Sequence, residues 1–215
     1  MQKYNNIVSL GYICNINALK NHLKGESHSM VFDNIATPMW AINELVISDF
    51  KDFMLEENIQ KKKLFTDSDE EFWIDSKYYT RFLFLGNHER FKKSIQKRIT
   101  NFKNTFNQSD PILFIRYEEP IMYDDRGERI IFPEYKNKYE KSELEYLKEL
   151  SKHIKSTYPQ LNFKILFLSS SDNFIDEENK IIGVKAEGHD YRNKHIGKNM
   201  AKILDEHKEF LDTNL

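Results

Sequence analysis

The residue with the clearest chemical potential is Cys14, the only cysteine in a chain of 215 residues. It follows Ile7–Leu10, whose continuous apolar run predicts a short buried strand, and it lies at the start of residues 13–23, where apolar residues recur at helical spacing. A thiol in the first turn of a helix faces unpaired backbone N–H groups and the positive end of the helix dipole, and both favour the thiolate. The position therefore predicts a nucleophile on a strand-to-helix turn. The alternative is a small, buried apolar side chain.

A nucleophilic cysteine needs a base, and a base needs a group that orients it. His88 comes after one predicted strand and directly before a predicted helix, while His189 and His195 lie in the last predicted loop region. Asp33 follows the short apolar run 30–32 and could orient the imidazole. The sequence does not decide which histidine reaches Cys14, because catalytic partners are neighbours in space rather than along the chain. A structural, hydrogen-bonded role is equally open for each histidine.

Arg116 ends the apolar run 112–115, which predicts a buried parallel strand. Ligands of open parallel sheets bind at the carboxyl ends of the strands, so a guanidinium in this place could hold a carboxylate or phosphate through two hydrogen bonds. The alternative is a structural ion pair with Glu118, Asp33 or Glu187. Both interpretations remain open at this point.

Three further polar residues follow later predicted strands, and we expect them to contact substrate: Ser170, His189 and Asp190. A metal site is the competing use of the imidazoles, with Cys14 or Asp33 as an additional ligand. However, no CxxC or HExxH spacing is present, and GxGxxG and Walker motifs are absent as well. We therefore expect no metal and no cofactor.

The elements that must position these residues alternate between strand and helix. Expected strands are 7–10, 30–32, 81–85, 112–115, 163–168 and 181–184, and expected helices are 13–23, 37–53, a long one through 91–106, one opened by a Ser142/Glu145 capping box, and 195–211. For the second helix, Thr37 is the expected N-cap and Pro38 the first helical residue. This order predicts a single α/β domain over 1–215, Rossmann-like or SGNH-like, with a mostly parallel central sheet and helices on both faces. Residues 54–80 and 118–138 are expected to be irregular excursions.

Composition and charge exclude several classes of function. The net charge is only −2, without the basic excess of a nucleic-acid-binding protein. We see neither a secretory signal nor an apolar run long enough to cross a membrane, and a single cysteine cannot form an internal disulfide. These features favour a reducing, cytoplasmic setting, with no membrane partner. Nothing in the sequence indicates an oligomeric state.

Four short motifs resemble a family of bacterial and viral proteins described as putative papain-like cysteine peptidases. They are Ser9-Leu10-Gly11-x-x-Cys14, Phe32-Asp33, Asn87-His88 and Phe114-Ile115-Arg116, in the order and rough spacing of that family. Val31 and Asn34 stand where the family usually has Pro and Trp around its Phe-Asp pair. The resemblance implies a thiol-dependent hydrolase or acyltransferase, although a papain fold is not the parallel α/β sheet that the pattern of elements predicts.

Two hypotheses follow. In the first, Cys14 attacks a peptide, amide or ester bond of a small-molecule, peptide or glycan substrate, His88 or else His195 is the base, Asp33 orients it, and Arg116 holds an anionic group. A nucleophile after the first strand and a histidine near the end of the chain resemble SGNH-type esterases. In the second, a non-catalytic or transferase-like domain binds a nucleotide-sugar or phosphorylated ligand through Arg116 and residues 169–171, and Cys14 only packs.

Overall fold

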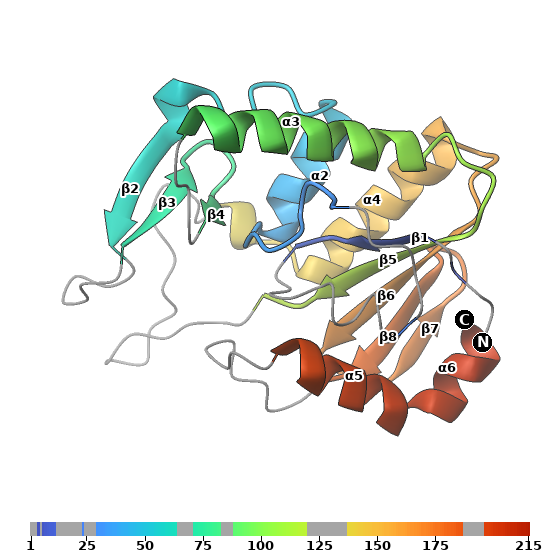
Figure 1. Cartoon of the computed structure of the whole chain (residues 1–215). Helices are drawn as coiled ribbons and strands as arrows, with labels where there is room; N and C mark the ends of the chain where they lie inside the picture. The colour runs from blue at the N-terminus through green and yellow to red at the C-terminus, as the bar shows by residue number, and fades with distance from the viewer. Residues whose placement is uncertain are drawn as a thin grey trace.

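A five-stranded sheet forms the centre of the computed structural model (Figure 1). The structure describes residues 4, 6–11, 23, 29–63, 71–82, 88–119, 137–186 and 196–215. The strand order is β1-β5-β6-β8-β7. Four strands run parallel, namely β1 (Asn6–Ser9), β5 (Ile112–Tyr117), β6 (Phe163–Ser169) and β8 (Ile181–Lys185), and β7 (Phe174–Asp176) pairs antiparallel with β8. The prediction of a mostly parallel α/β sheet is therefore confirmed.

Strand β5 shows why these apolar runs form interior strands. All six of its residues are buried, and successive side chains point to opposite faces of a sheet. Ile112 and Phe114 join the core cluster on one face, whereas Leu113 and Ile115 join the cluster on the other. Because both faces of this strand are apolar, the sheet needs a layer of packed structure on each side to shield them from water.

Helices supply those two layers. On one face lie α2 (Met39–Ile47), α3 (His88–Thr105) and α4 (Glu143–Thr157), and on the other lie α5 (Ile196–Glu206) and α6 (Lys208–Asn214) (Figure 1). The predicted capping box of α4 is present, since Ser142 Oγ accepts a hydrogen bond from the Glu145 N–H and the Glu145 carboxylate accepts one from the Ser142 N–H. The helix predicted over 195–211 is instead divided at His207, whose ring nitrogen Nε2 lies 3.2 Å from the Lys185 carbonyl oxygen.

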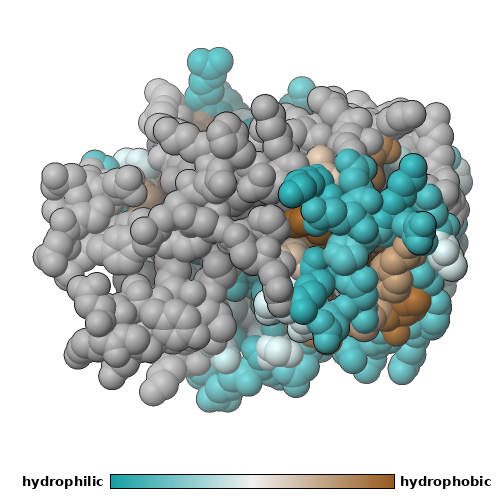
Figure 2. Space-filling view, turned by 90° about the horizontal axis from the view of Figure 1, so that it is seen from below, coloured by the Kyte–Doolittle hydropathy of each residue, from teal (hydrophilic) through white to brown (hydrophobic). Residues whose placement is uncertain are grey.

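The face that carries α5 and α6 is largely hydrophilic over its described surface, with only narrow breaks of hydrophobic atoms (Figure 2). The apolar side chains of Ile203, Leu204 and Leu211 on these helices are instead buried against the sheet. In the part of the chain that the structure describes, no helix is long and apolar enough to cross a membrane.

Two local predictions before β2 are wrong. Residues 30–32 form part of a turn rather than a strand, although all three side chains are buried. Helix α2 begins at Met39, with Pro38 as its N-cap and without a side-chain cap, so Thr37 is not the capping residue. The Thr37 carbonyl oxygen has another use, because it accepts a hydrogen bond from Arg116.

A second, three-stranded antiparallel sheet occupies much of the stretch predicted to be irregular. It consists of β2 (Ile59–Lys63), β3 (Glu71–Asp75) and β4 (Thr80–Phe82), and a short 3-10 turn, η1 (Glu56–Asn58), precedes it. The strand expected at 81–85 thus belongs, in its described part, to this sheet rather than to the central one. Most of the second expected excursion, 120–136, lies outside the described residues.

Asp75 fixes this small sheet to the segment after α2. Its carboxylate is fully buried and accepts hydrogen bonds from the backbone N–H groups of Met54 at 2.8 Å, Lys77 at 3.0 Å and Tyr78 at 3.3 Å. Burial raises the pKa of Asp75 above its ordinary value, while these backbone donors act in the opposite direction.

Aromatic rings join the layers above the central sheet. Phe102 of α3 makes edge contacts with Phe32, Phe50 and Phe106, with ring centroids 5.4, 5.6 and 5.3 Å away. Phe106 also stacks on Phe114 of β5. The turn at 30–34, the segment after α2, helix α3 and the sheet therefore share one core.

Candidate functional site

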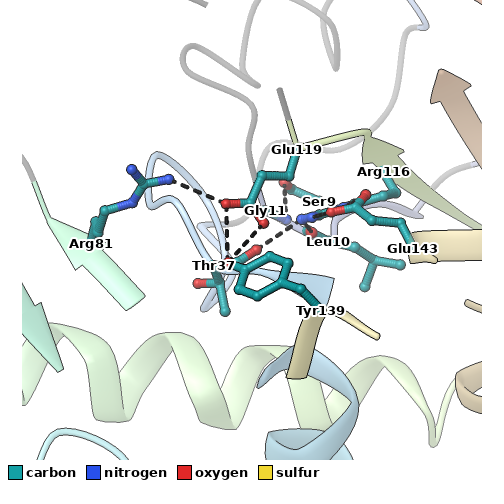
Figure 3. Close-up of polar contacts among 9 residues, drawn as sticks. All are labelled: Ser9, Leu10, Gly11, Thr37, Arg81, Arg116, Glu119, Tyr139 and Glu143. Atoms are coloured by element: carbon teal, nitrogen blue, oxygen red, sulfur yellow. Dashed lines mark hydrogen bonds and ion pairs between the residues drawn. The ribbon is translucent and has the colours of Figure 1, made fainter. Parts of the chain in front are cut away.

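Polar side chains gather where β1 and β5 end, at the carboxyl edge of the sheet (Figure 3). The chain leaves β1 through Leu10, whose N–H donates to the Ile115 carbonyl oxygen at 2.8 Å. It then turns at Gly11, whose φ of 77° lies in the left-handed region. The Gly11 N–H donates to the Ser9 hydroxyl at 3.1 Å. The start of the predicted nucleophile turn is thus hydrogen-bonded on both sides.

Arg116 of β5 lies behind this turn and is 0% exposed. Its Nη1 donates to the carbonyl oxygens of Leu10 at 2.7 Å and Thr37 at 2.9 Å. Its Nε donates to Glu143 Oε2 at 3.1 Å, and its Nη2 pairs with Glu143 Oε1. The guanidinium therefore forms a two-pronged ion pair with Glu143, a carboxylate that was not considered from the sequence. Of the three partners that were considered, Glu187 lies outside the described residues.

Glu143 reaches Arg116 from the first turn of α4, because a helix that follows a parallel strand begins at the carboxyl edge of the sheet (Figures 1 and 3). Burial raises the pKa of the Glu143 carboxyl above its ordinary value. Arg116 and the backbone N–H of Glu119 act in the opposite direction, and the negative charge of Glu119 adds to the rise.

A second arginine and carboxylate extend the cluster toward the small sheet. Arg81 of β4 lies 3.6 Å from Glu119, just after β5, and both side chains are nearly buried. The Tyr139 hydroxyl lies 3.4 Å from each carboxylate oxygen of Glu119. Burial raises the pKa of Tyr139, and Glu119 adds to the effect, so this phenol keeps its proton. Figure 3 shows these side chains converging between β4, β5 and α4.

Asp33 is buried in the turn that precedes α2. Its Oδ2 accepts a hydrogen bond from the Met30 N–H at 2.9 Å, and its backbone carbonyl accepts one from Arg98 of α3 at 3.2 Å. These contacts fix the turn, while the role of Asp33 in orienting a histidine stays a prediction.

Ser170 lies beside β5, at the end of β6. The carboxylate of Glu118 accepts hydrogen bonds from its N–H at 2.9 Å and its hydroxyl at 3.1 Å. The neighbouring Tyr117 has its pKa raised to about 12, first by burial and then by the charge of Glu118. Ser170 is exposed at the edge where substrate contacts are expected, and that function stays a prediction.

Most of the other predicted site residues lie outside the residues that the structure describes. Cys14, His189, Asp190 and His195 are not among the described residues. For His88 only the backbone is described, and it is the first residue of α3. Of the predicted residues, the structure therefore positions Arg116, Asp33 and Ser170 with their contacts.

Sequence reasoning missed Glu143, Glu119, Tyr139 and Arg81. No local pattern relates Arg116 to a residue 27 positions away. The capping box did locate the start of α4, and strand–helix–strand topology places such a start near the end of the preceding strand. That combination was the one available signal for Glu143. Within the described ranges, no three His, Cys, Asp or Glu side chains gather as metal ligands.

Comparison with known proteins identifies a family. The model of a family described as "Putative papain-like cysteine peptidase" matches residues 5–173. The matched range includes Cys14, Asp33, His88, Arg116 and Ser170, and it ends before the last histidines considered. Searches of the curated proteins and of the solved structures found no match.

Proposed function

The chain belongs to the family described as putative papain-like cysteine peptidase, and we propose that it is a cysteine-dependent hydrolase or acyltransferase with Cys14 as its nucleophile. The substrate bond is a peptide, amide or ester. The observation that supports this proposal most is the geometry of the β1 exit. A strand that ends at the ligand-binding edge continues into a glycine turn, three residues before the only cysteine of the chain.

Cys14 lies outside the described residues, and its place in this proposal follows from its position in the sequence. It comes three residues after Gly11, and three residues of fully extended chain span at most about 10 Å. His88 is the proposed base within the matched range and begins α3, while His195 is the alternative. Asp33 is the proposed orienting carboxylate.

The proposed reaction has two steps. The base takes the thiol proton, the sulfur attacks the carbonyl carbon, and the leaving amine or alcohol departs with that proton, which leaves a thioester on Cys14. Water, or another acceptor, then attacks the thioester with the same histidine removing its proton, and the thiol is restored. Ser170, His189 and Asp190 are the proposed substrate contacts.

The role proposed for Arg116 differs from the one expected from the sequence, which was to hold an anionic group of the substrate. A substrate anion would compete with Glu143 for the same N–H groups, so its contacts favour a positioning role. The hypothesis of a nucleotide-sugar or phosphate site loses support for the same reason, because it depended first on Arg116, whose N–H groups bind Glu143, Leu10 and Thr37.

The test is the pH dependence of alkylation by iodoacetamide. Because the chain has one cysteine, the adduct identifies its site without ambiguity. An activated Cys14 has an alkylation midpoint at least about one pH unit below the free thiol value of about 8.5. A midpoint at or above that value would show an ordinary thiol. The Cys14→Ala variant, which has no thiol, measures background reaction at other residues.

A further inference from the structure

A fully buried guanidinium is expensive to remove from water, so its partners indicate what it does. Replacing a buried ion pair by apolar residues of similar volume is often neutral or even stabilising, and such a pair is therefore weak evidence of a contribution to stability. What the Arg116–Glu143 pair supplies instead is geometry, since the planar fork of arginine fixes direction as well as distance.

The other side of the guanidinium holds two chain segments together. Leu10 follows β1 and Thr37 precedes α2, and the carbonyl oxygens of both accept from the single nitrogen Nη1. With Glu143 in α4 as the third partner, one side chain joins the exit of β1, the entrance of α2 and the first turn of α4. Hydrogen bonds from a charged donor are roughly twice as strong as neutral ones.

Gly11 allows this arrangement by leaving room for the guanidinium. A Cβ on Gly11 would lie 3.3 Å from Arg116 Nη1 and 3.3 Å from the Thr37 carbonyl oxygen. The turn is therefore packed directly on the arginine. Any displacement of Nη1 must shift the Leu10 carbonyl or the Thr37 carbonyl, and with them the direction in which the chain leaves β1.

We propose that the buried Arg116–Glu143 pair is a positioning device that fixes the Leu10–Gly11 turn and so places the nucleophile segment that follows it. This inference rests on the proposed role of Cys14. The backbone N–H of Glu119 reaches the Glu143 carboxylate, and Glu119 is paired with Arg81. These contacts connect the Arg116–Glu143 pair to Arg81 in the small sheet. Arg116 and Glu143 act through the turn and not on the substrate.

Two conservative variants test the proposal. Arg116→Lys keeps the positive charge but loses the fork, so it cannot hold Glu143 at two points and both carbonyls in the same geometry. Glu143→Gln keeps the shape and loses the charge. The matched control is Lys148→Met, which removes a lysine from the same helix as Glu143 and breaks its 3.1 Å pair with Asp176 of β7.

We expect both site variants to raise the alkylation midpoint of Cys14 by half a pH unit or more, and so to lower the thiolate fraction and the alkylation rate at neutral pH. Hydrogen exchange of a peptide that covers residues 6–11 should become faster in both variants. The control should change neither quantity. Circular dichroism establishes that each variant is folded, and Glu143→Gln decides the question if Arg116→Lys does not fold.

The outcomes separate the two proposals. A wild-type midpoint near the free value overturns the proposed function, whatever the variants do. If the wild-type midpoint is depressed but Arg116→Lys or Glu143→Gln, when folded, has the same midpoint as wild type, the positioning role alone is overturned. Unchanged hydrogen exchange at 6–11 in the folded variants also overturns it, because the turn would then not depend on the pair.

Discussion

Replacing Gly11 by alanine should destabilise the protein by about 2 kcal/mol. A left-handed conformation costs an L-residue about 1–2 kcal/mol, and φ is 77° at this position. The new Cβ would lie 3.3 Å from both Arg116 Nη1 and the Thr37 carbonyl oxygen, and weakening the bond between them costs about 1 kcal/mol more. Against this, alanine restricts the unfolded chain and returns about 0.4–1 kcal/mol.

Urea unfolding followed by tryptophan fluorescence measures this change, because Trp40 in α2 is buried in the same core. For a chain of this length, the expected loss lowers the melting temperature by about 4–8 °C. Asn34→Ala is the control, since Asn34 also has a positive φ, of 59°, and alanine at this position adds no atom that asparagine lacks. It should cost about 1 kcal/mol. Equal free energies of unfolding for Gly11→Ala and wild type would refute the reasoning.

Three further predictions concern stability. Phe102→Ala removes the ring of α3 that contacts the turn at 30–34 and the segment after α2, and should cost about 3–5 kcal/mol in the same urea experiment. Ser142→Ala removes the capping box of α4 and should cost about 1 kcal/mol, seen as a lower urea midpoint with an unchanged slope. The pKa of Tyr117 rises from 10.0 unfolded to about 12 folded, so the folded state holds more protons in this interval, and its stability should fall as pH rises from 10 to about 12. Urea titrations at several alkaline pH values, compared with Tyr117→Phe, measure that loss.

The parts of the fold that could be predicted from sequence are those with a strong local signal. Strands β5 and β6 each contain a continuous run of four apolar residues, 112–115 and 165–168, and the start of α4 carries a complete capping box. The small sheet lacked such a signal, because β2 reads Ile-Gln-Lys-Lys-Lys and shows no apolar alternation. Lysines are a common way to protect an edge strand from further pairing, so the same residues fit a strand as well as a loop.

At the candidate site, too, some features could be predicted from the sequence and others could not. Arg116 could be identified as unusual, because a charged residue ends a buried strand, but its partner could not. The choice of Glu143 depends on how α4 packs against the end of β5, which is a property of the tertiary structure. Likewise, Thr37 had the residue type of an N-cap, yet its carbonyl is held by Arg116 and α2 begins two residues later. In both cases a long-range contact outweighed a local preference.

The most direct test of Cys14 as nucleophile is the fate of an acyl group. The wild-type protein, Cys14→Ala and Cys14→Ser are incubated with a panel of activated esters and peptide amides, and both product release and the intact mass of each protein are followed. We expect turnover by wild type, an acyl adduct that maps to Cys14, and loss of both in Cys14→Ala. Turnover that persists in Cys14→Ala, or an adduct that maps to another residue of an active wild-type protein, would contradict this expectation.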